Sequence, residues 1–319
     1  MTTSEKNNAR SIQKIAILIP CFNEELTVGK VVDDFRQELP SSPVYVFDNN
    51  STDATAAIAE RHGAIVIPST RSGKGNVVRH MFETIEAEKY IMVDGDDTYD
   101  ATSVHELLRV SQEFNAHMVV GLRLSDYEKG AFRLLHKFGN HFIAKVITLL
   151  FSHKVTDVLS GYRVFSRDFV RVAHLKSEGF EIETEMTLQA LLKNLIVKEV
   201  PTSYRERPAG SKSKLNTFLD GIAIIKAIFL IFKDYKPLVF FSSLSFICFV
   251  SGLIAGWFPI RDYLSERYVY HVPLAILAAS LAILSVLFLG IGFILNSIAN
   301  LHNETQLLMR KLFKEIDKV

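Results

Sequence analysis

The chain has 319 residues, of which 22% are charged and 48% belong to the hydrophobic set, and its formal net charge is +1. A near-neutral charge excludes a generally basic nucleic-acid binder, and the apolar content excludes a disordered chain. The two cysteines, Cys21 and Cys248, lie far apart in unlike contexts, so they indicate neither a disulfide framework nor a cysteine metal cluster.

The first part of the chain alternates short β-rich runs with helical patterns. The predicted strands are Ile15–Ile19, Val44–Phe47, Ala64–Ile67, Tyr90–Val93 and Met118–Val120. The predicted helices between them are Glu25–Leu39, Thr52–His62, Gly75–Glu88 and Ser103–Phe114. Alternation at this spacing is typical of right-handed β-α-β units, so we expect an α/β domain with a mainly parallel sheet.

Polar segments follow four successive predicted strands. They are Pro20–Glu25, Asp48–Asp53, Arg71–Gly75 and Asp94–Asp97. Because ligands of such sheets bind beyond the carboxyl ends of the strands, we expect these segments to share one site. The glycines at 73 and 75 fit neither G-x-G-x-x-G nor G-x-x-x-x-G-K-[ST], so the sequence supports neither a dinucleotide dehydrogenase nor a P-loop enzyme.

Four aspartates lie within seven residues at the end of an apolar strand: Asp94, Asp96, Asp97 and Asp100. Packed carboxylates repel one another unless a cation neutralises them, and oxygen ligands suit Mg²⁺ or Mn²⁺. An EF-hand counted from Asp94 would need glycine and glutamate where Tyr99 and His105 stand, so that site is excluded. A solvated turn that caps the next helix is the competing interpretation, and for Asp100 alone it is the favoured one.

The C-terminal part is apolar. Residues 238–303 hold only four charged side chains, and Leu238–Phe258 and Pro273–Ser297 hold none. At about 1.5 Å of rise per residue, each of these two segments can cross a hydrocarbon core of about 30 Å. The short connection Pro259–Val272 predicts an antiparallel helical hairpin. A buried hairpin in a soluble core is the alternative, and the lengths disfavour it.

Two further helices are predicted near the membrane. Leu215–Tyr235 is dense in apolar residues and carries lysines that reach headgroups, which favours a helix lying in the interface. Phe132–Phe151 fits either a core helix or a lipid contact. We therefore expect a folded domain, an interfacial helix, a transmembrane hairpin and a tail, at residues 1–214, 215–236, 237–300 and 301–319.

Lysine and arginine flank the predicted hairpin, and only Arg261 and Arg267 lie between its two helices. The positive-inside rule then predicts an integral membrane protein with both termini and the folded domain in the cytoplasm. In a bacterium, that membrane would be the inner or plasma membrane.

With these residues assembled, the chain resembles the inverting family-two glycosyltransferases of the GT-A fold. It is most similar to the polyprenyl-phosphate sugar synthases, the group that contains dolichol-phosphate mannose synthase and the membrane-anchored glucosyltransferases of bacterial O-antigen modification. The resemblance covers roughly residues 15–241. The motifs that carry it are IPCFNEE, DNNSTD, RSGKG, DGDD, GLR, DVLSGYRVF and SKL.

The resemblance implies a donor pocket, a metal site and an acceptor site. The implied donor-binding residues are Pro20, Asn23, Glu24, Asp48, Lys74, Asp94 and Arg207. The implied ligands of Mg²⁺ or Mn²⁺ are Asp94 and Asp96, and the implied acceptor-phosphate residues are Arg123, Arg163 and Lys214. Among them, the catalytic roles fall to Asp96, Arg123 and Arg163. Asp48 would bond the base, and Glu24 would lie near the ribose or base.

Several of these roles have alternatives. Asp48 also fits a turn and Lys74 a surface lysine. Thr98 stands where the archaeal-type synthases carry a metal-binding glutamine, and the SKL segment has one extra residue of spacing, which weakens the role of Lys214. Glu183 and Glu185 either reach the site or begin a helix, where carboxylates favour the dipole.

The implied activity is the inverting, metal-dependent transfer of a hexose from a nucleotide sugar, with UDP-glucose as first choice, to a polyprenyl phosphate at the cytoplasmic membrane face. Members of the group often form homo-oligomers, and no nucleic-acid partner is expected. A processive polysaccharide synthase is disfavoured because the only tryptophan, Trp257, follows Ala255-Gly256 and so lies outside any Q-x-x-R-W signature. A non-catalytic, membrane-anchored nucleotide-sugar-binding protein is the other alternative, and the intact Asp94 and Asp96 disfavour it.

Overall fold

The computed structural model describes residues 13–124, 155–208 and 236–316, with a few isolated positions between them. The chain divides into two compact units, Met1–Ala227 and Ile228–Val319.

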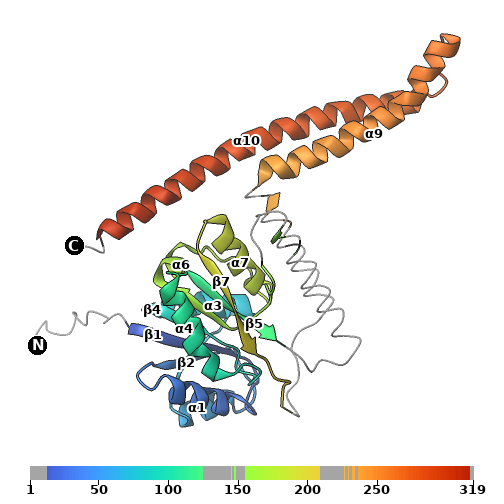
Figure 1. Cartoon of the computed structure of the whole chain (residues 1–319). Coiled ribbons are helices and arrows are strands. Elements are labelled where there is room, and N and C mark those ends of the chain that lie inside the picture. The colour runs from blue at the N-terminus through green and yellow to red at the C-terminus, as the bar shows by residue number, and fades with distance from the viewer. Residues whose placement is uncertain are drawn as a thin grey trace, which may run out of the picture. The chain divides into compact units, whose positions relative to one another are not determined.

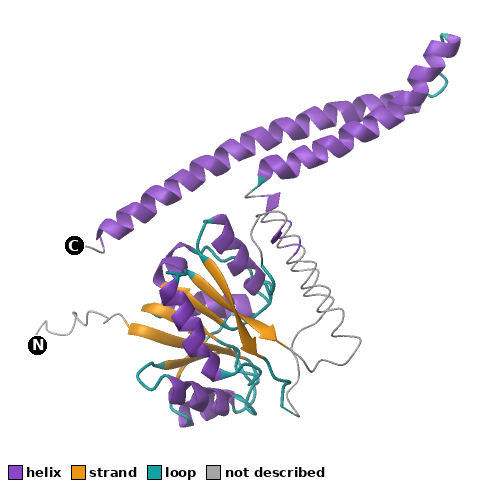
Figure 2. Cartoon of the chain, in the orientation of Figure 1, coloured by secondary structure: helices purple, strands orange, loops and turns teal. Residues whose placement is uncertain are grey.

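The first unit is built on one seven-stranded sheet (Figures 1 and 2). Its strands stand in the order β3-β2-β1-β4-β6-β5-β7. Their bounds are β1 Gln13–Cys21, β2 Val44–Asp48, β3 Ile65–Pro68, β4 Ala87–Met92, β5 Met118–Leu124, β6 Arg163–Ser166 and β7 Val197–Ser203. Four of the neighbouring pairs are parallel, and only β6 runs antiparallel to its neighbours β4 and β5. The predicted α/β fold with a mainly parallel sheet is confirmed.

Helices cover the sheet on both faces (Figure 2). Their bounds are α1 Val28–Glu38, α2 Thr55–Arg61, α3 Lys74–Thr84, a short 3₁₀-helix Ala101–Ser103, α4 Val104–Glu113, α6 Arg167–Val172 and α7 Ile182–Leu192. The central strands are accordingly apolar without alternation: Ile17, Leu18, Ile19 and Ile91 have no exposed surface. Burial of each such side chain contributes about 1.5–3 kcal/mol, so this layer holds the strand ends that carry the polar loops in place.

Two of the helices begin three residues later than predicted, at Val28 and Thr55. The loops that precede them hold each other instead. The amide of Asn23 donates to Ser51 Oγ over 2.9 Å, and the amide of Glu24 donates to Thr55 Oγ1 over 2.8 Å. These bonds join the loop after β1 to the loop after β2, so the two polar segments form one rigid edge.

The second unit is a pair of long helices, α9 Pro237–Glu266 and α10 Val272–Ile316. The predicted connection Pro259–Val272 is too long, because α9 continues through Pro259 to Glu266. Arg267, which has a left-handed φ of 57°, caps the helix. The predicted end of the hairpin at residue 300 marks only the end of the apolar stretch, since α10 continues to Ile316.

The apolar surface of these two helices faces outward. Of the most apolar 18 residues, 17% are buried in α9 and 6% in α10, whereas a core helix of a soluble protein would be mostly buried. Between the helices, Ser245 and Ser285 share a buried hydrogen bond of 3.0 Å between their hydroxyls. Both helices are long and apolar enough to cross a membrane, and they could form a transmembrane hairpin.

Candidate active site

The strand order reverses between β1 and β4. The chain leaves β1 through α1 toward β2, while β4 lies on the opposite side of β1. Loops that diverge in this way leave a crevice at the carboxyl ends of the strands, where ligands of open α/β sheets bind. Asn23 and Asp97 turn the two loops with φ values of 53° and 55°, a conformation that Asn and Asp tolerate better than most residues.

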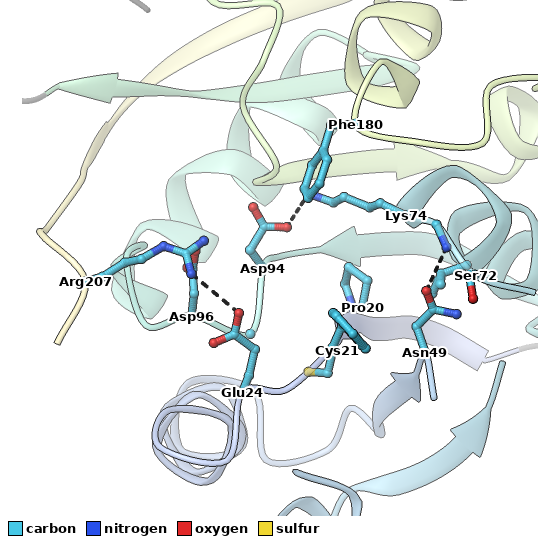
Figure 3. A pocket seen from close by; sticks show the side chains of 14 residues that line it. Pro20, Cys21, Glu24, Asn49, Ser72, Lys74, Asp94, Asp96, Phe180 and Arg207 are labelled. Atoms are coloured by element: carbon cyan, nitrogen blue, oxygen red, sulfur yellow. Dashed lines mark hydrogen bonds and ion pairs between the residues drawn. The ribbon is translucent and has the colours of Figure 1, made fainter. Parts of the chain in front are cut away.

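A cavity of about 300 Å³ opens at this edge (Figure 3). Its volume is in the range of small-molecule sites. The wall comes from the ends of β1, β2 and β4, the start of α3, the loop before α7 and the segment after β7. The lining residues are Pro20, Cys21, Phe22, Glu24, Asn49, Ser72, Gly73, Lys74, Val77, Asp94, Gly95, Asp96, Phe180 and Arg207.

Lys74 is a mostly buried cation at the N-terminus of α3, with its side chain 12% exposed, and not a surface lysine. Its Nζ lies 2.5 Å from Asp94 Oδ1 and 2.5 Å from Glu183 Oε1. Burial disfavours the charged amine, but the two carboxylates outweigh that effect and raise the pKa of Lys74. The lysine therefore stays protonated and neutralises charge beside Asp94.

Glu183 lies in the first turn of α7, and its side chain is only 4% exposed. Burial, which its contact with Lys74 opposes, raises the pKa of the Glu183 carboxyl. Glu185, by contrast, accepts hydrogen bonds from the amides of Lys176 and Ser177. Glu183 therefore reaches the site through Lys74, whereas Glu185 fixes the loop that carries Phe180.

Glycines let that loop approach α3 closely. The amide of Gly75 donates to Glu178 O over 2.9 Å, and a Cβ at Gly75 would lie 2.1 Å from Ser177 O. No side chain fits there without moving the backbone. The glycines of the RSGKG motif therefore bring Phe180 and Lys74 to the same end of the cavity, where the ammonium lies 5.8 Å from the ring centroid.

Asp96 is held from both sides. The hydroxyl of Thr98 donates to its Oδ1 over 2.6 Å, and Arg207 Nη2 lies 2.5 Å from its Oδ2. Burial first, and then the nearby Asp94, raise the pKa of the Asp96 carboxyl, while Arg207 opposes the rise. Thr98 therefore orients Asp96 in this structure. Its hydroxyl proton points at the carboxylate.

Asp94 and Asp96 are the residues that fit a divalent cation. Both line the cavity, and carboxylate oxygens are the donors that Mg²⁺ and Mn²⁺ prefer. The described residues contain no cluster of three or more His, Cys, Asp or Glu arranged to hold a metal. Mg²⁺ in proteins is usually bound by one or two carboxylates, and water and phosphate oxygens fill its other coordination positions.

The other predicted donor residues divide into two groups. Pro20 and Glu24 line the cavity, whereas Asn23 and Asp48 do not. Asn23 Oδ1 accepts from the amide of Thr52 over 2.8 Å, so its side chain fixes the loop. Asp48 Oδ2 accepts from the amide of Ser51 over 3.2 Å, which fits the predicted turn. Its Oδ1 is buried and has no hydrogen-bond partner among the described residues.

Asn49 and Phe180 line the cavity and were not predicted. The Asn49 side chain accepts from the amide of Gly73 over 2.9 Å and donates to Arg71 O over 2.7 Å. It therefore fixes the loop before α3 against the end of β2. Asn49 could have been predicted from its place in the DNNSTD motif, whereas no pattern in the sequence singles out Phe180.

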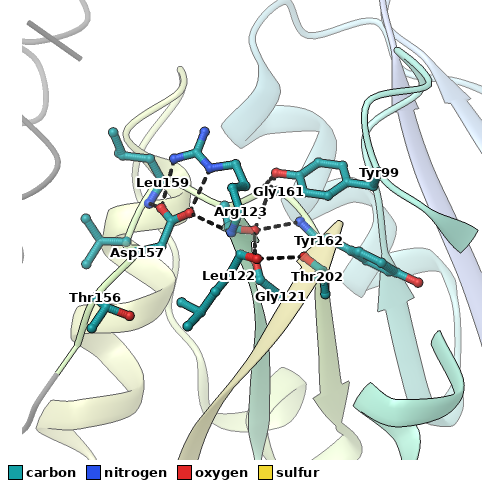
Figure 4. A network of polar contacts seen from close by, with 12 residues as sticks. Tyr99, Gly121, Leu122, Arg123, Thr156, Asp157, Leu159, Gly161, Tyr162 and Thr202 are labelled. Carbon is teal, nitrogen blue, oxygen red and sulfur yellow. Dashed lines mark hydrogen bonds and ion pairs between the residues drawn. The ribbon is translucent and has the colours of Figure 1, made fainter. Parts of the chain in front are cut away.

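Arg123 lies in a separate polar network (Figure 4). Its guanidinium makes a two-pronged ion pair with Asp157, with Nε 2.7 Å from Oδ2 and Nη2 2.8 Å from Oδ1. Burial favours the protonated carboxyl, but the guanidinium outweighs it and lowers the pKa of Asp157. The side chain of Arg123 is 27% exposed and stays accessible, although it does not line the cavity. Asp157, from the DVLSGYRVF motif, was missed.

Arg163 does not occupy the expected acceptor position. It is fully buried at the start of β6. Its guanidinium donates to Ser160 O over 2.8 Å, to Val158 O over 2.9 Å and to Thr187 Oγ1 over 2.9 Å. An acceptor phosphate cannot reach a group that solvent does not reach, so the expected role of Arg163 is corrected to a structural one.

Gly161 connects the Arg123 network to the cavity. Its amide donates to Tyr99 Oη over 2.9 Å, and a Cβ at this position would lie 2.3 Å from Asp94 Oδ2. The SGYR motif therefore needs glycine so that its backbone can approach Asp94. Lys214, the predicted interfacial helix and the predicted helix Phe132–Phe151 fall almost entirely outside the described residues.

Comparison with known sequences identifies relatives. Residues 16–172 match the model of the family described as Glycosyl transferase family 2. The chain is 34% identical to glycosyltransferase AglJ of Haloferax volcanii, over 91% of this chain and 95% of the relative. It is 27% identical to the dolichyl-phosphate hexose transferase of the same organism, over 67% of this chain and 92% of the relative.

Comparison with solved structures gives the same fold. Glucosyl-3-phosphoglycerate synthase from Mycobacterium tuberculosis, crystallised with Mn²⁺, UDP-glucose and phosphoglyceric acid, superposes with a TM-score of 0.57 at 18% identity, over 69% of this chain and 79% of that one. At this identity the likeness concerns the fold, which is GT-A-like. The chain is a glycosyltransferase and belongs to glycosyl transferase family 2.

Proposed function

We propose that the protein transfers a hexose from a nucleotide sugar, with UDP-glucose as the first candidate, to a polyprenyl phosphate at the cytoplasmic face of a membrane. The observation that carries this proposal is the cavity with Asp94 and Asp96, in a chain that also has two helices of membrane-spanning length. A relative named dolichyl-phosphate hexose transferase, which shares 92% of its length with this chain, supports the lipid acceptor.

The donor would occupy the cavity at the edge of β1 and β4. Pro20 and Glu24 line it, with Glu24 near the ribose or base. The bond from Asp48 to the base is proposed on the resemblance alone, because Asp48 does not line the cavity and its Oδ1 is buried. Lys74, held protonated by Asp94 and Glu183, supplies a fixed positive charge beside the diphosphate.

Asp94 and Asp96 would hold the Mg²⁺ or Mn²⁺ ion, which, when bound, stabilises charge on the departing diphosphate as a Lewis acid. Thr98 keeps Asp96 oriented for this role through the 2.6 Å bond from its hydroxyl. The structural neighbour solved with Mn²⁺ and UDP-glucose shares the fold and is consistent with this use of the site.

The chemical step would be a single in-line displacement. An oxygen of the lipid phosphate forms a bond to the anomeric carbon while the bond from that carbon to the nucleoside diphosphate breaks, so the configuration inverts. The second pKa of a phosphate monoester is about 6, so the nucleophile is already anionic and requires no strong general base. The protein mainly aligns two anions and stabilises their charge.

Arg123 is the residue that we assign to the acceptor phosphate. Its fork geometry suits a phosphate, and it stays accessible beside Asp157. Asp157 holds the guanidinium in place in the absence of the acceptor. Lys214 is assigned to the same phosphate on the resemblance alone.

The two C-terminal helices would place this chemistry at a lipid surface. Lysine and arginine flank the pair, whereas only Arg261 and Arg267 stand between the apolar stretches. The positive-inside rule then orients both ends of the chain toward the cytoplasm. A membrane-anchored domain meets the phosphate of a lipid acceptor without a soluble carrier.

Sugar transfer by the full chain, purified in detergent, tests the proposal. A panel of labelled nucleotide sugars is incubated with a polyprenyl phosphate and Mn²⁺ or Mg²⁺, with chelator and no-lipid controls. The proposal predicts label in the lipid extract from one donor, lost in both controls. Metal-dependent binding of a nucleotide sugar without transfer from any donor would instead indicate a non-catalytic binding protein.

A further inference from the structure

Arg207 occupies the position at Asp96 that a metal ion would need. It follows β7, and its Nη2 lies 2.5 Å from Asp96 Oδ2 while its Nη1 lies 3.5 Å from Glu24 Oε1 (Figure 3). The carboxylates are nearly buried, with side chains 5% exposed for Asp96 and 9% for Glu24, whereas the Arg207 side chain is 26% exposed. The arginine therefore reaches into the cavity from its open side.

Both oxygens of Asp96 are engaged in this state. Oδ1 accepts from Thr98 and Oδ2 accepts from Arg207. A divalent cation at Oδ2 would compete with the guanidinium for the same lone pairs and would be repelled by its charge. Binding of a cation to Asp96 therefore requires Arg207 to move away.

The charges of the cavity wall favour such an exchange. The wall carries three carboxylates, Glu24, Asp94 and Asp96, and two cations, Lys74 and Arg207. Without Arg207, the donor-free wall would hold three carboxylates against one lysine, at a high electrostatic cost in a partly buried site. A divalent cation supplies that charge instead and leaves the guanidinium available for an anion.

The chain just before Arg207 is anchored to the loop that carries Asp96. The amide of Arg205 donates to Thr98 O over 2.7 Å, and Tyr204 forms a strand-like bridge with Tyr99. The Arg205 side chain lies outside the cavity and pairs with Asp100 over 3.2 Å. The backbone at Tyr204 and Arg205 is therefore held beside the site.

We infer that Arg207 is an exchangeable partner of Asp96: it neutralises Asp96 in the donor-free enzyme, and it moves to the diphosphate of the donor when a divalent cation takes its place. Glu24 keeps the guanidinium at the cavity during the exchange. Arg207 is thus a positioning residue that couples cation binding to donor binding. This inference rests on the proposed function insofar as it takes the ligands to be a divalent cation and a nucleoside diphosphate.

The exchange predicts effects of opposite sign for one substitution. In Arg207→Gln the competitor of the cation is removed, so Mn²⁺ alone should bind about tenfold more tightly. The same variant should bind UDP or GDP, measured at saturating Mn²⁺, about tenfold more weakly, because it lacks the charged bond to the diphosphate. Arg207→Lys should keep most of the competition with Mn²⁺.

The measurement is calorimetric titration of the full chain in detergent, with Mn²⁺ first and then the nucleoside diphosphate. Arg205→Gln is the matched control, since it removes a neighbouring arginine outside the cavity and should change neither affinity. Circular dichroism of each variant shows that the fold is retained. Tighter Mn²⁺ binding with weaker nucleotide binding, for Arg207→Gln only, supports the exchange.

Unchanged or weaker Mn²⁺ binding by folded Arg207→Gln would overturn the inference, because Arg207 would then not compete with the cation. If Arg207→Gln does not fold, the affinities of Arg207→Lys are measured instead, and its Mn²⁺ affinity should stay near the wild-type value. Weaker binding of the nucleoside diphosphate by Arg207→Lys would then support the exchange, and unchanged binding would overturn it. These titrations use neither a sugar nor a lipid, so failure of lipid-linked sugar formation would leave their outcome unaffected, and the two failures can be told apart.

Discussion

The cavity and the Arg123 network both contain charged residues from recognisable motifs, yet they use charge differently. In the cavity, Lys74 and Arg207 hold carboxylates that face an open space of about 300 Å³. Around β5 and β6, Arg123 is paired with Asp157, and the guanidinium of Arg163 is fully buried and donates to protein atoms. A motif therefore marks where a charged residue lies, while burial decides whether a ligand can reach it.

The largest effect is expected at the cavity. Asp96→Asn should lower the rate of sugar transfer by about 10²–10³-fold, because it removes a carboxylate charge that would hold the cation beside the diphosphate. The matched control is Asp97→Asn, since Asp97 pairs with Lys30 outside the cavity lining and its left-handed φ suits asparagine. Transfer rates and circular dichroism check both variants. Near-normal turnover of folded Asp96→Asn would contradict the metal assignment.

Arg163 should affect stability, not acceptor binding. Arg163→Met leaves two buried carbonyls and one hydroxyl without their donor, which should lower the free energy of unfolding by about 3 kcal/mol. Thermal unfolding in detergent measures the loss. If Arg163→Met unfolded at the wild-type temperature and needed a higher acceptor concentration for half-maximal transfer, Arg163 would contact the acceptor in the working enzyme, and its structural role would be contradicted.

Arg123, in contrast, should affect acceptor binding. Arg123→Gln should raise the acceptor concentration needed for half-maximal transfer by about tenfold, the equivalent of one charged hydrogen bond of about 1.4 kcal/mol. The donor requirement should change little, because Arg123 does not line the cavity. Steady-state kinetics with each substrate varied in turn provides the test, and equal changes in both requirements would count against the acceptor assignment.

The smallest expected effect is on how the stability of the folded state depends on pH. The Arg123 guanidinium lowers the pKa of Asp157 below its unfolded value of about 3.9. The ion pair therefore stabilises the folded state above that unfolded pKa, and the contribution is lost as the pH falls through the lower, folded pKa. Wild type should be more stable than Asp157→Asn at pH 7, and the gap should narrow at pH values below about 4. A gap independent of pH would contradict the ionised pair.

The first half of the domain could be predicted because its signals are local. Runs such as Ile15–Ile19 are apolar and β-branched, and each is followed by a polar loop, so strands, helices and the cavity edge followed from periodicity. The strands β6 and β7 were not predicted. The four residues of β6 carry no alternation, and their insertion between β4 and β5 depends on contacts distant in the sequence.

In the candidate site, too, only the residues placed by local signals could be predicted. Asp94, Asp96 and Lys74 lie together because strand ends of a parallel sheet meet at one edge, and this follows from the order of the elements. Arg163 could not be placed correctly from its motif. Its burial depends on the Val158 and Ser160 carbonyls and on Thr187 of α7, which no local pattern brings together.

We propose above that this site transfers a hexose, with inversion, to a lipid phosphate. The most direct measurement is the identity and anomeric configuration of the lipid-extracted product formed from UDP-glucose and a polyprenyl phosphate, by mass spectrometry and NMR. The account predicts a polyprenyl-phosphate hexose with a β linkage from the α-linked donor. A product that retains the α configuration, or sugar found only outside the lipid fraction, would contradict it.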